Sequence, residues 1–216
     1  MAITQQTPPI FTDARCCLFG DSFVAGIGDP TGQGWSGRLF APLLAQGTPI
    51  TVYNLGIRRE SSRQIAQRYS QEARPRFAMG DWFGSLFSFG VNDTVILHSQ
   101  PRLGQQESLS HAASLARRAA QFGAVSFIGP PPVDDPAQNS RIQALDAAMG
   151  QMLGAMQIPY CSVFAALVES AVWMDEVKKG DGSHPAAAGY GEMAQVIMEW
   201  PEWWFYQTEE PPHGET

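Results

Sequence analysis

Ser22 comes directly after a short apolar run, Cys16 to Phe19, in the sequence Gly20-Asp21-Ser22. A serine at the end of a buried strand can present its hydroxyl at the edge of a sheet, where it can act as a nucleophile. It can equally cap a following helix, because serine is a preferred capping residue. A serine nucleophile needs a base, so the rest of the chain decides between these two interpretations.

One of the four histidines, His184, lies three residues after a carboxylate, in Asp181-Gly182-Ser183-His184-Pro185. A carboxylate in this position can orient an imidazole and stabilise its charged form, as a general base requires. Proline favours the first position of a helix, so we expect a helix from Pro185 towards Trp200. We expect His111 and His213 at the surface, and His98 either at the surface or in the core.

Polar groups also follow two further apolar runs. The second run ends in Asn54-Leu55-Gly56 and the third in Gly90-Val91-Asn92-Asp93. If these runs are parallel strands, their carboxyl ends meet at one edge of the sheet, which is where ligands bind in open α/β folds. A hydroxyl, a glycine amide and a side-chain amide together can carry out acyl transfer, with the amides stabilising an oxyanion. Two structural alternatives stay open: Gly56 for backbone freedom or close packing, and Asn92 as a turn residue.

The elements that would position these groups alternate along the chain. Near-continuous apolar runs of a few residues are typical of parallel strands covered on both faces. Such runs occupy 16–19, 50–55, 82–89, 124–128 and 160–164, and helix-compatible stretches occupy 35–46, 61–74, 105–121 and 137–157. This order predicts an α/β fold with an open, doubly wound sheet. We expect a single domain over 15–206, with loose segments at 1–14 and 207–216.

With all four polar blocks in this order, the sequence resembles the SGNH hydrolases, also called the GDSL esterase/lipase family. The blocks are GDS at 20–22, NLG at 54–56, GVND at 90–93 and DGSHP at 181–185, so the resemblance spans nearly the whole chain. It implies a flavodoxin-like α/β/α sandwich of three layers with about five parallel strands, and no cofactor or metal. It also implies Ser22 as nucleophile, His184 as base and Asp181 as the residue that orients it. The Ser22 amide, the Gly56 amide and the Asn92 side chain become the oxyanion donors.

Two positions depart from the family pattern. Phe23 replaces the leucine of the family motif, which should leave the chemistry intact. After Gly56 the family often has another small residue, whereas this chain continues with Ile57-Arg58-Arg59-Glu60. We expect the two arginines at a solvated helix start, with Arg58 or Arg59 binding a substrate anion as the less favoured interpretation.

The resemblance leaves the substrate open, because family members cleave carboxylic esters, thioesters, lysophospholipids and acetylated sugars. We expect a serine esterase that acts on small, short-acyl carboxylic esters through an acyl-enzyme. The alternatives are a thioesterase or lysophospholipase, a carbohydrate deacetylase, and an inactive binding protein of the same fold. A dinucleotide-binding fingerprint fails, because Thr31 stands where Gly26 and Gly28 require a third glycine. A G-x-S-x-G hydrolase motif fails at Val24.

Charge and composition limit the partners and the compartment. The net charge of -7 disfavours nucleic acid as a partner, because phosphates would be repelled. We find no apolar run long enough for a membrane span and no secretion signal, and the three cysteines suit reduced thiols. We therefore expect a cytoplasmic protein. The aromatic run from Trp200 to Tyr206 either docks on the core or lies at the substrate mouth or a homodimer contact.

Overall fold

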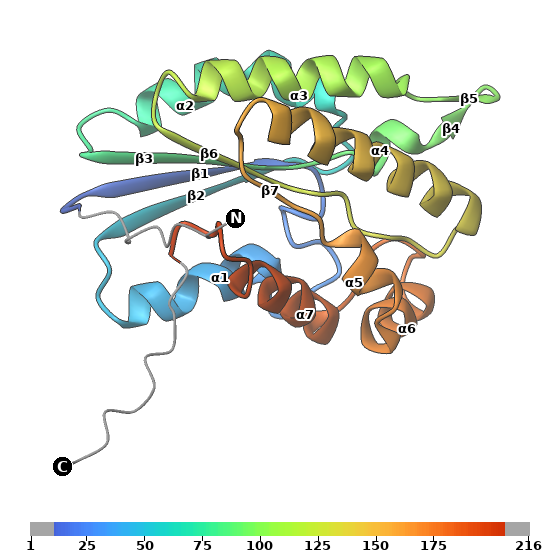
Figure 1. Ribbon diagram of the computed structural model, residues 1–216. Helices are drawn as coiled ribbons and strands as arrows, with labels where there is room; N and C mark the ends of the chain where they lie inside the picture. Colours follow the sequence, from blue (N-terminus) through green and yellow to red (C-terminus); the bar gives the residue numbers. More distant parts are fainter. Residues whose placement is uncertain (1–10, 206–216) are drawn as a thin grey trace, which may run out of the picture.

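The computed structural model describes residues 11–205, which form a five-stranded parallel sheet between two layers of helices (Figure 1). The sheet order is β2-β1-β3-β6-β7. The strands are β1 (Ala14–Gly20), β2 (Ile50–Gly56), β3 (Trp82–Ser88), β6 (Ala124–Ile128) and β7 (Tyr160–Cys161). Every pairing within this sheet is parallel. The predicted α/β/α sandwich with about five parallel strands is therefore confirmed.

The central strand β1 is buried on both faces, because its successive side chains alternate between two hydrophobic cores. Cys16 and Leu18 belong to one core, and Cys17 and Phe19 belong to the other. A strand that fills two cores has no polar face, which explains its near-continuous apolar sequence.

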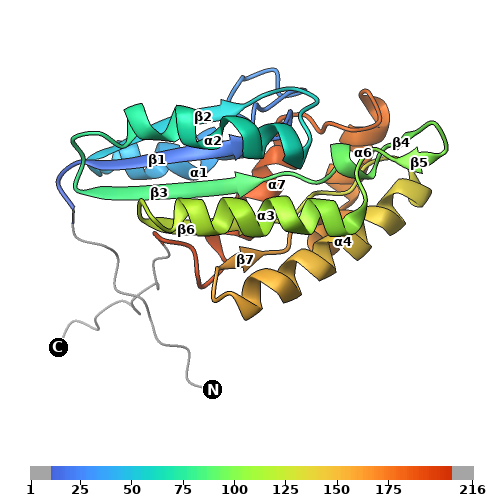
Figure 2. The ribbon, with the colours of Figure 1, turned by 90° about the horizontal axis from the view of Figure 1, so that it is seen from above.

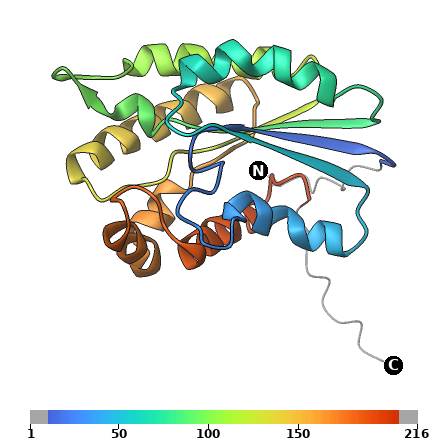
Figure 3. The same ribbon diagram turned by 180° about the vertical axis from the view of Figure 1, so that it is seen from behind.

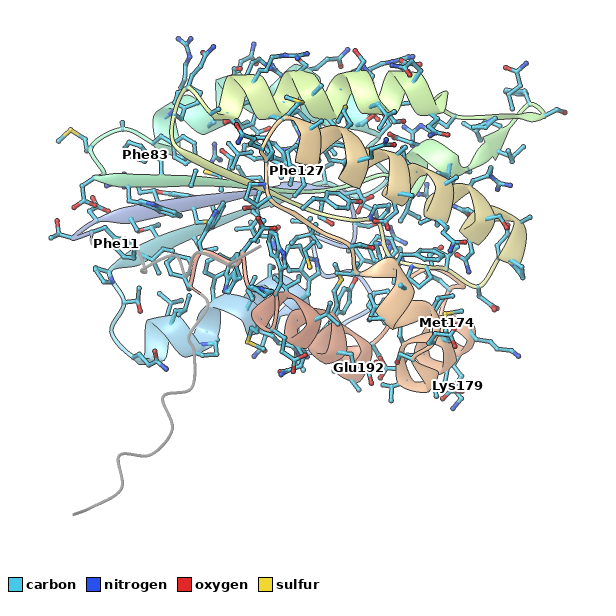
Figure 4. All side chains as sticks on the ribbon, viewed as in Figure 1. Phe11, Phe83, Phe127, Met174, Lys179 and Glu192 are labelled. Carbon is cyan, nitrogen blue, oxygen red and sulfur yellow. The ribbon has the colours of Figure 1, made fainter. Side chains whose placement is uncertain are left out.

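The helices divide between the two faces of the sheet. One layer holds α2 (Ser62–Arg76), α3 (Gln105–Ala119) and α4 (Pro136–Ala155), and the other holds α1 (Gly34–Ala45), α5 (Phe164–Val168), α6 (Ala171–Lys179) and α7 (Ala187–Met198). Figure 1 has the first layer above the sheet and the second below it, and Figure 3 gives the same division from behind. In Figure 4, Phe127 of β6 lies between the sheet and the layer of α3 and α4, where it stacks on Phe87.

Several element boundaries differ from the sequence-based expectation. The fifth strand ends at Cys161, and the helix α5 begins within the range predicted as strand. The final helix begins at Ala187 and not at Pro185, because Ala186 still has extended backbone. A short hairpin of β4 (Ile96–Leu97) and β5 (Gln100–Pro101) follows a 3-10 turn, η1 (Asn92–Thr94), and was not predicted. The helices α5 and α6 lie outside the helix-compatible stretches and were not predicted.

The carboxyl ends of the strands all lie at one edge of the sheet. Figure 2 shows the arrowheads of β1, β2 and β3 pointing towards the side where α6 and the β4–β5 hairpin lie. The chain order reverses between β1 and β3, since β2 lies on one side of β1 and all later strands lie on the other. Such a switch point is the usual ligand-binding position in doubly wound sheets.

The aromatic segment after α7 packs on the chain's own core. Trp203, Trp204 and Phe205 are buried there, and Trp204 meets the ring of Trp82 edge-on at 5.3 Å. Trp82 begins β3, so these three rings lie at the amino end of the sheet and not at the substrate mouth. Tyr206 lies outside the described residues, as do the segments 1–10 and 207–216. A homodimer contact through this segment stays a prediction.

The three cysteines are free and buried, as their sequence context predicts. Burial raises the pKa of both Cys17 and Cys161 to about 12, so these thiols stay protonated at neutral pH. Within residues 11–205, no helix is both long enough and apolar enough to cross a bilayer.

The end of β1 tolerates only glycine, which yields a test of the packing. A Cβ on Gly20 would lie 2.1 Å from the carbonyl oxygen of Ser88 and 2.4 Å from a methyl carbon of Val24. We expect Gly20→Ala to lower the free energy of unfolding by about 1–3 kcal/mol, measured by urea denaturation. Gly191→Ala is the control, because nothing lies within 4 Å of its Cβ position in α7. An unchanged midpoint for Gly20→Ala would contradict this account.

Candidate active site

Ser22, His184 and Asp181 lie in one hydrogen-bonded row at the carboxyl edge of the sheet. The Nε2 atom of His184 is 2.8 Å from Ser22 Oγ, and its Nδ1 atom is 2.7 Å from Asp181 Oδ2. The Ser22 residue is 4% exposed, whereas the Asp181 side chain is 48% exposed. The arrangement lets the imidazole accept the serine proton while the carboxylate stabilises the positive charge that results.

The spacing of Asp181 and His184 lets one carboxylate fix both the backbone and the ring. Asp181 Oδ1 accepts the backbone N–H groups of Ser183 and His184, at 3.0 and 2.9 Å. Gly182, which follows Asp181, has φ of 80°, a left-handed conformation that favours glycine. Burial alone would raise the pKa of Asp181, but these backbone bonds and the His184 ring hold it at about 2. The carboxylate is therefore ionised wherever the imidazole can act as a base.

Glu176 caps the start of the helix that follows the His184 loop, a role that the sequence analysis missed. Its carboxylate accepts the N–H groups of Ala186, Ala188 and Gly189 at the start of α7. It thus caps a helix terminus whose partial positive charge would oppose a charged imidazole. No motif marks Glu176 in the sequence, because the cap comes from the preceding helix, α6.

The turn that carries Ser22 packs directly against the histidine loop. The ring of Phe23 lies 4.9 Å from the His184 ring, centroid to centroid. A Cβ on Gly28, where φ is 93°, would lie 2.5 Å from the carbonyl oxygen of Pro185. Tyr190 of α7 donates its hydroxyl to the Ile27 carbonyl at 2.7 Å. These contacts explain how Ser22 keeps hydrogen-bonding distance to a residue far away in sequence.

Asn92 is held by two acceptors beside the turn that carries Ser22. Its Nδ2 group donates to Asp21 Oδ2 at 3.1 Å and to the Glu60 carbonyl at 3.0 Å. Asp21 also accepts the Phe23 N–H, so one buried carboxylate connects the ends of β1 and β3. To donate to an oxyanion, the Asn92 amide has to break one of these two hydrogen bonds or share its hydrogen between the present acceptor and the oxyanion.

The Gly56 amide also has an acceptor. It donates to Asn54 Oδ1 at 3.0 Å, and Asn54 in turn donates to the Val24 carbonyl and to Ser36 Oγ. A Cβ on Gly56 would lie 2.3 Å from the Ala25 nitrogen, so close packing alone requires glycine here. The role of Gly56 as an oxyanion donor stays a prediction, while its packing role is a direct observation.

The loop after Gly56 is a turn and not the expected helix start. Arg59 has φ of 68°, which is uncommon for a residue with a side chain. Among residues 11–205, neither the Ser22 N–H nor the Arg59 N–H has a hydrogen-bond acceptor. Glu60 pairs with Arg68 at 2.7 Å and not with Arg58 or Arg59.

Arg68 connects this loop to the ends of β1 and β2. Its guanidinium donates to the carbonyl groups of Gly20 and Leu55, at 3.2 and 2.7 Å. It also lies over the Phe19 ring, 5.5 Å from the centroid. The sequence analysis missed Arg68, because nothing in a helix interior distinguishes an arginine that turns inward from one in solvent.

The model of the GDSL-like Lipase/Acylhydrolase family matches residues 18–191. The chain belongs to this family. The predicted resemblance is therefore confirmed, and the protein is a hydrolase that acts on ester bonds. The matched range includes all four blocks quoted from the sequence. No curated protein matches the chain in sequence.

Solved structures with the same fold support the architecture. A lipase/acylhydrolase from Enterococcus faecalis is 21% identical with a TM-score of 0.69, over 85% of this chain and 93% of that one. A catalytic mutant of an acetylxylan esterase from Geobacillus stearothermophilus is 15% identical with a TM-score of 0.69, over 92% and 98% of the two chains. A G-D-S-L lipolytic protein from Veillonella parvula is 18% identical with a TM-score of 0.68, over 86% and 97%. At these identities the likeness concerns the fold alone.

Within the described part of the chain, no group of three or more His, Cys, Asp or Glu side chains could hold a metal ion.

The buried Asp21 predicts a pH-dependent stability. Burial raises its pKa to about 7, despite the N–H donors of Phe23 and Asn92. Because the folded-state pKa lies above the unfolded value, protonated Asp21 favours the folded state and the benefit is lost as pH rises from about 4 to about 7. The wild-type free energy of unfolding should fall over this window by on the order of a few kcal/mol relative to Asp21→Asn, which cannot ionise.

Urea denaturation at pH 5 and pH 8 measures this difference. Asp175→Asn, at an exposed carboxylate of α6, is the control and should keep the wild-type pH dependence. If Asp21→Asn shows the same pH dependence as wild type, the ionisation of Asp21 does not affect stability.

Proposed function

We propose that the protein is a serine esterase that hydrolyses small carboxylic esters with short acyl chains. The observation that carries this proposal is the continuous row from Ser22 Oγ through both ring nitrogens of His184 to Asp181 Oδ2, with contacts of 2.8 and 2.7 Å. In this proposal Ser22 is the nucleophile, His184 the general base and acid, and Asp181 the residue that orients the imidazole.

In the acylation step, Ser22 Oγ attacks the carbonyl carbon of the ester while its proton moves to His184 Nε2. The carbonyl oxygen becomes an oxyanion, and the imidazolium is stabilised by Asp181. When the tetrahedral intermediate collapses, the Nε2 proton moves to the leaving oxygen and the alcohol departs. The acyl group remains on Ser22 as an ester.

Deacylation repeats these steps with water as the nucleophile. His184 Nε2 takes a proton from the water as its oxygen attacks the acyl carbon. The second intermediate then releases the carboxylic acid and returns the proton to Ser22 Oγ. Both halves use the same groups, so a single site suffices for hydrolysis.

The oxyanion needs N–H donors that face the reacting carbonyl. We assign this role to the Ser22 N–H, whose hydrogen has no acceptor among the described residues, and to the Asn92 side chain. Gly56 is the third donor that the sequence indicates. The Arg59 N–H in the same loop is a further candidate, because it has no acceptor, whereas the Gly56 N–H is bonded to Asn54.

The same carbonyl chemistry would also cleave thioesters, lysophospholipids and acetylated sugars, which are the alternative substrates. The remaining alternative is an inactive protein of this fold that only binds a ligand. A panel of acyl esters of increasing chain length separates a short-acyl esterase from an enzyme that acts on long-chain lipids. We expect the highest kcat/KM with acyl chains of a few carbons. A rate that rises steadily to long fatty acyl esters would favour a lipid substrate.

The proposed partner is therefore a small-molecule ester. We propose no nucleic-acid partner. We also propose a cytoplasmic location, which the three free, buried cysteines support. Fractionation of cells that produce the tagged protein tests this location.

Ser22→Ala removes the proposed nucleophile. We expect kcat for a short-chain activated ester to fall on the order of 10⁴-fold or more, because losing a triad member removes the covalent route. A fluorophosphonate probe should label wild type, and mass spectrometry should locate the adduct on Ser22. Ser140→Ala, at an exposed serine of α4, should keep both activity and labelling. Near-normal turnover by Ser22→Ala would end the proposal.

Asn92→Ala tests the oxyanion assignment. We expect kcat to fall by about 10²- to 10³-fold with little change in KM, since the donor acts mainly in the transition state. Thermal unfolding of the variant checks that the loop around Asp21 and Glu60 still folds. A raised KM with unchanged kcat would make Asn92 a substrate-binding residue.

A further inference from the structure

Arg58 lies at the rim of the site, where the loop after β2 meets the loop that carries the histidine. Its Nη2 atom is 4.0 Å from Asp181 Oδ2, and its side chain is 54% exposed. This distance is too long for a hydrogen bond. Asp181 is already occupied, because its two oxygens accept two backbone N–H groups and the His184 ring. Arg58 is therefore not needed to satisfy that carboxylate.

The Arg58 guanidinium also has no hydrogen-bond acceptor elsewhere among residues 11–205. Four other arginines around this edge of the sheet donate to protein acceptors. These are Arg38 to Asp29 and the Gly34 carbonyl, Arg63 to Glu107, Arg68 to Glu60 and two strand-end carbonyls, and Arg102 to the Arg59 carbonyl and Gln64. The guanidinium of Arg59, the next residue, also has no acceptor among residues 11–205, so the position of Arg58 is what sets it apart: its side chain is the one that lies 4.0 Å from Asp181.

The position of Arg58 has an electrostatic cost for catalysis. The imidazole of His184 becomes positive during the reaction, and a nearby guanidinium disfavours that charge. A negative group bound by Arg58 would cancel this effect while the substrate is in place. The position of Arg58 therefore favours an anionic substrate over a neutral one. The overall charge of -7 gives the protein no general attraction for anions, so this preference would come from Arg58 itself.

The geometry also indicates which half of the ester carries the anion. His184 gives its proton to the leaving oxygen, so in the proposed mechanism the alcohol half lies on the histidine side of Ser22. Arg58 lies 4.0 Å from Asp181, the carboxylate on the other side of the same ring. A carboxylate matches the two-pronged donor set of a guanidinium better than it matches an ammonium.

We propose that Arg58 is a specificity-determining residue that binds a carboxylate on the alcohol half of the substrate. The preferred substrates are then small acyl esters of hydroxy acids. This inference rests on the proposed function, because it uses the same nucleophile and base.

The test compares meta-acetoxybenzoate, which carries a carboxylate on the leaving group, with its neutral methyl ester. We expect Arg58→Gln to lower kcat/KM for the carboxylate ester about 3- to 10-fold, mainly through KM, and to change the methyl ester less than about twofold. Arg58→Lys should recover part of the loss, because it restores the positive charge but not the two parallel N–H donors of the guanidinium. Arg63→Gln, at an arginine that is also 54% exposed but paired with Glu107, is the control and should change neither ester.

Equal losses on both esters would overturn the proposal and make Arg58 a residue that positions Asp181. Unchanged rates on both would also overturn it. A second measurement does not depend on turnover: calorimetric binding of meta-hydroxybenzoate and its methyl ester to Ser22→Ala, with and without Arg58→Gln. The acid should bind more tightly than its methyl ester only when Arg58 is present. Equal binding of the two refutes the Arg58 assignment, whereas hydrolysis by Ser22→Ala at the wild-type rate refutes the serine mechanism.

Discussion

The hydrogen bond between Ser22 Oγ and His184 Nε2 joins residues 162 positions apart, and the arrangement of the carboxyl edge depends on it. Two loops from different layers have to meet within a few tenths of an ångström. The first is fixed by the end of β1, where Gly20 packs against the Ser88 carbonyl. The second is fixed by the capped start of α7, where Glu176 binds three backbone N–H groups. Their direct contact leaves little freedom for either loop.

A second constraint is the burial of two carboxyl groups close to Ser22. Asp21 is almost completely buried and accepts N–H groups from Phe23 and Asn92. Its neighbour Asp93 is equally buried and accepts the Ser62 N–H, which connects η1 to the start of α2. Buried carboxylates of this kind are costly, so each has to organise the backbone around it. The result is that the strand ends of β1 and β3 and the loop before α2 form one hydrogen-bonded unit.

Arg68 provides the positive side of this unit. Its guanidinium group donates to the carbonyl groups at the ends of β1 and β2 and pairs with Glu60. Glu60 in turn offers its carbonyl to Asn92. One partly buried cation thus connects β1 to the loop that carries Arg58 and Arg59. The free arginine at the rim and the committed arginine below it differ only in what the fold places around them.

The sequence by itself determined the layered α/β fold and the three residues of the Ser22-His184-Asp181 row. Buried parallel strands must be apolar along their whole length, and polar residues at their ends stand out against that pattern. The Asp181–His184 spacing is equally local, since one carboxylate reaches both the backbone and the ring of a residue three positions later. Family resemblance then connected blocks that no local pattern could join.

Only the tertiary structure decided how the remaining groups are used. The sequence predicts the Gly56 N–H as an oxyanion donor, but in the structure it donates to Asn54 Oδ1. Asn92 has both of its N–H bonds to protein acceptors, and Arg58 is separated from its sequence neighbour Glu60 because Arg68 takes that carboxylate. These outcomes depend on which of several chemically equivalent partners the fold places within hydrogen-bonding distance. A sequence fixes which residues can donate or accept, but hydrogen bonds and ion pairs form between atoms, and only folding brings those atoms within 3 Å.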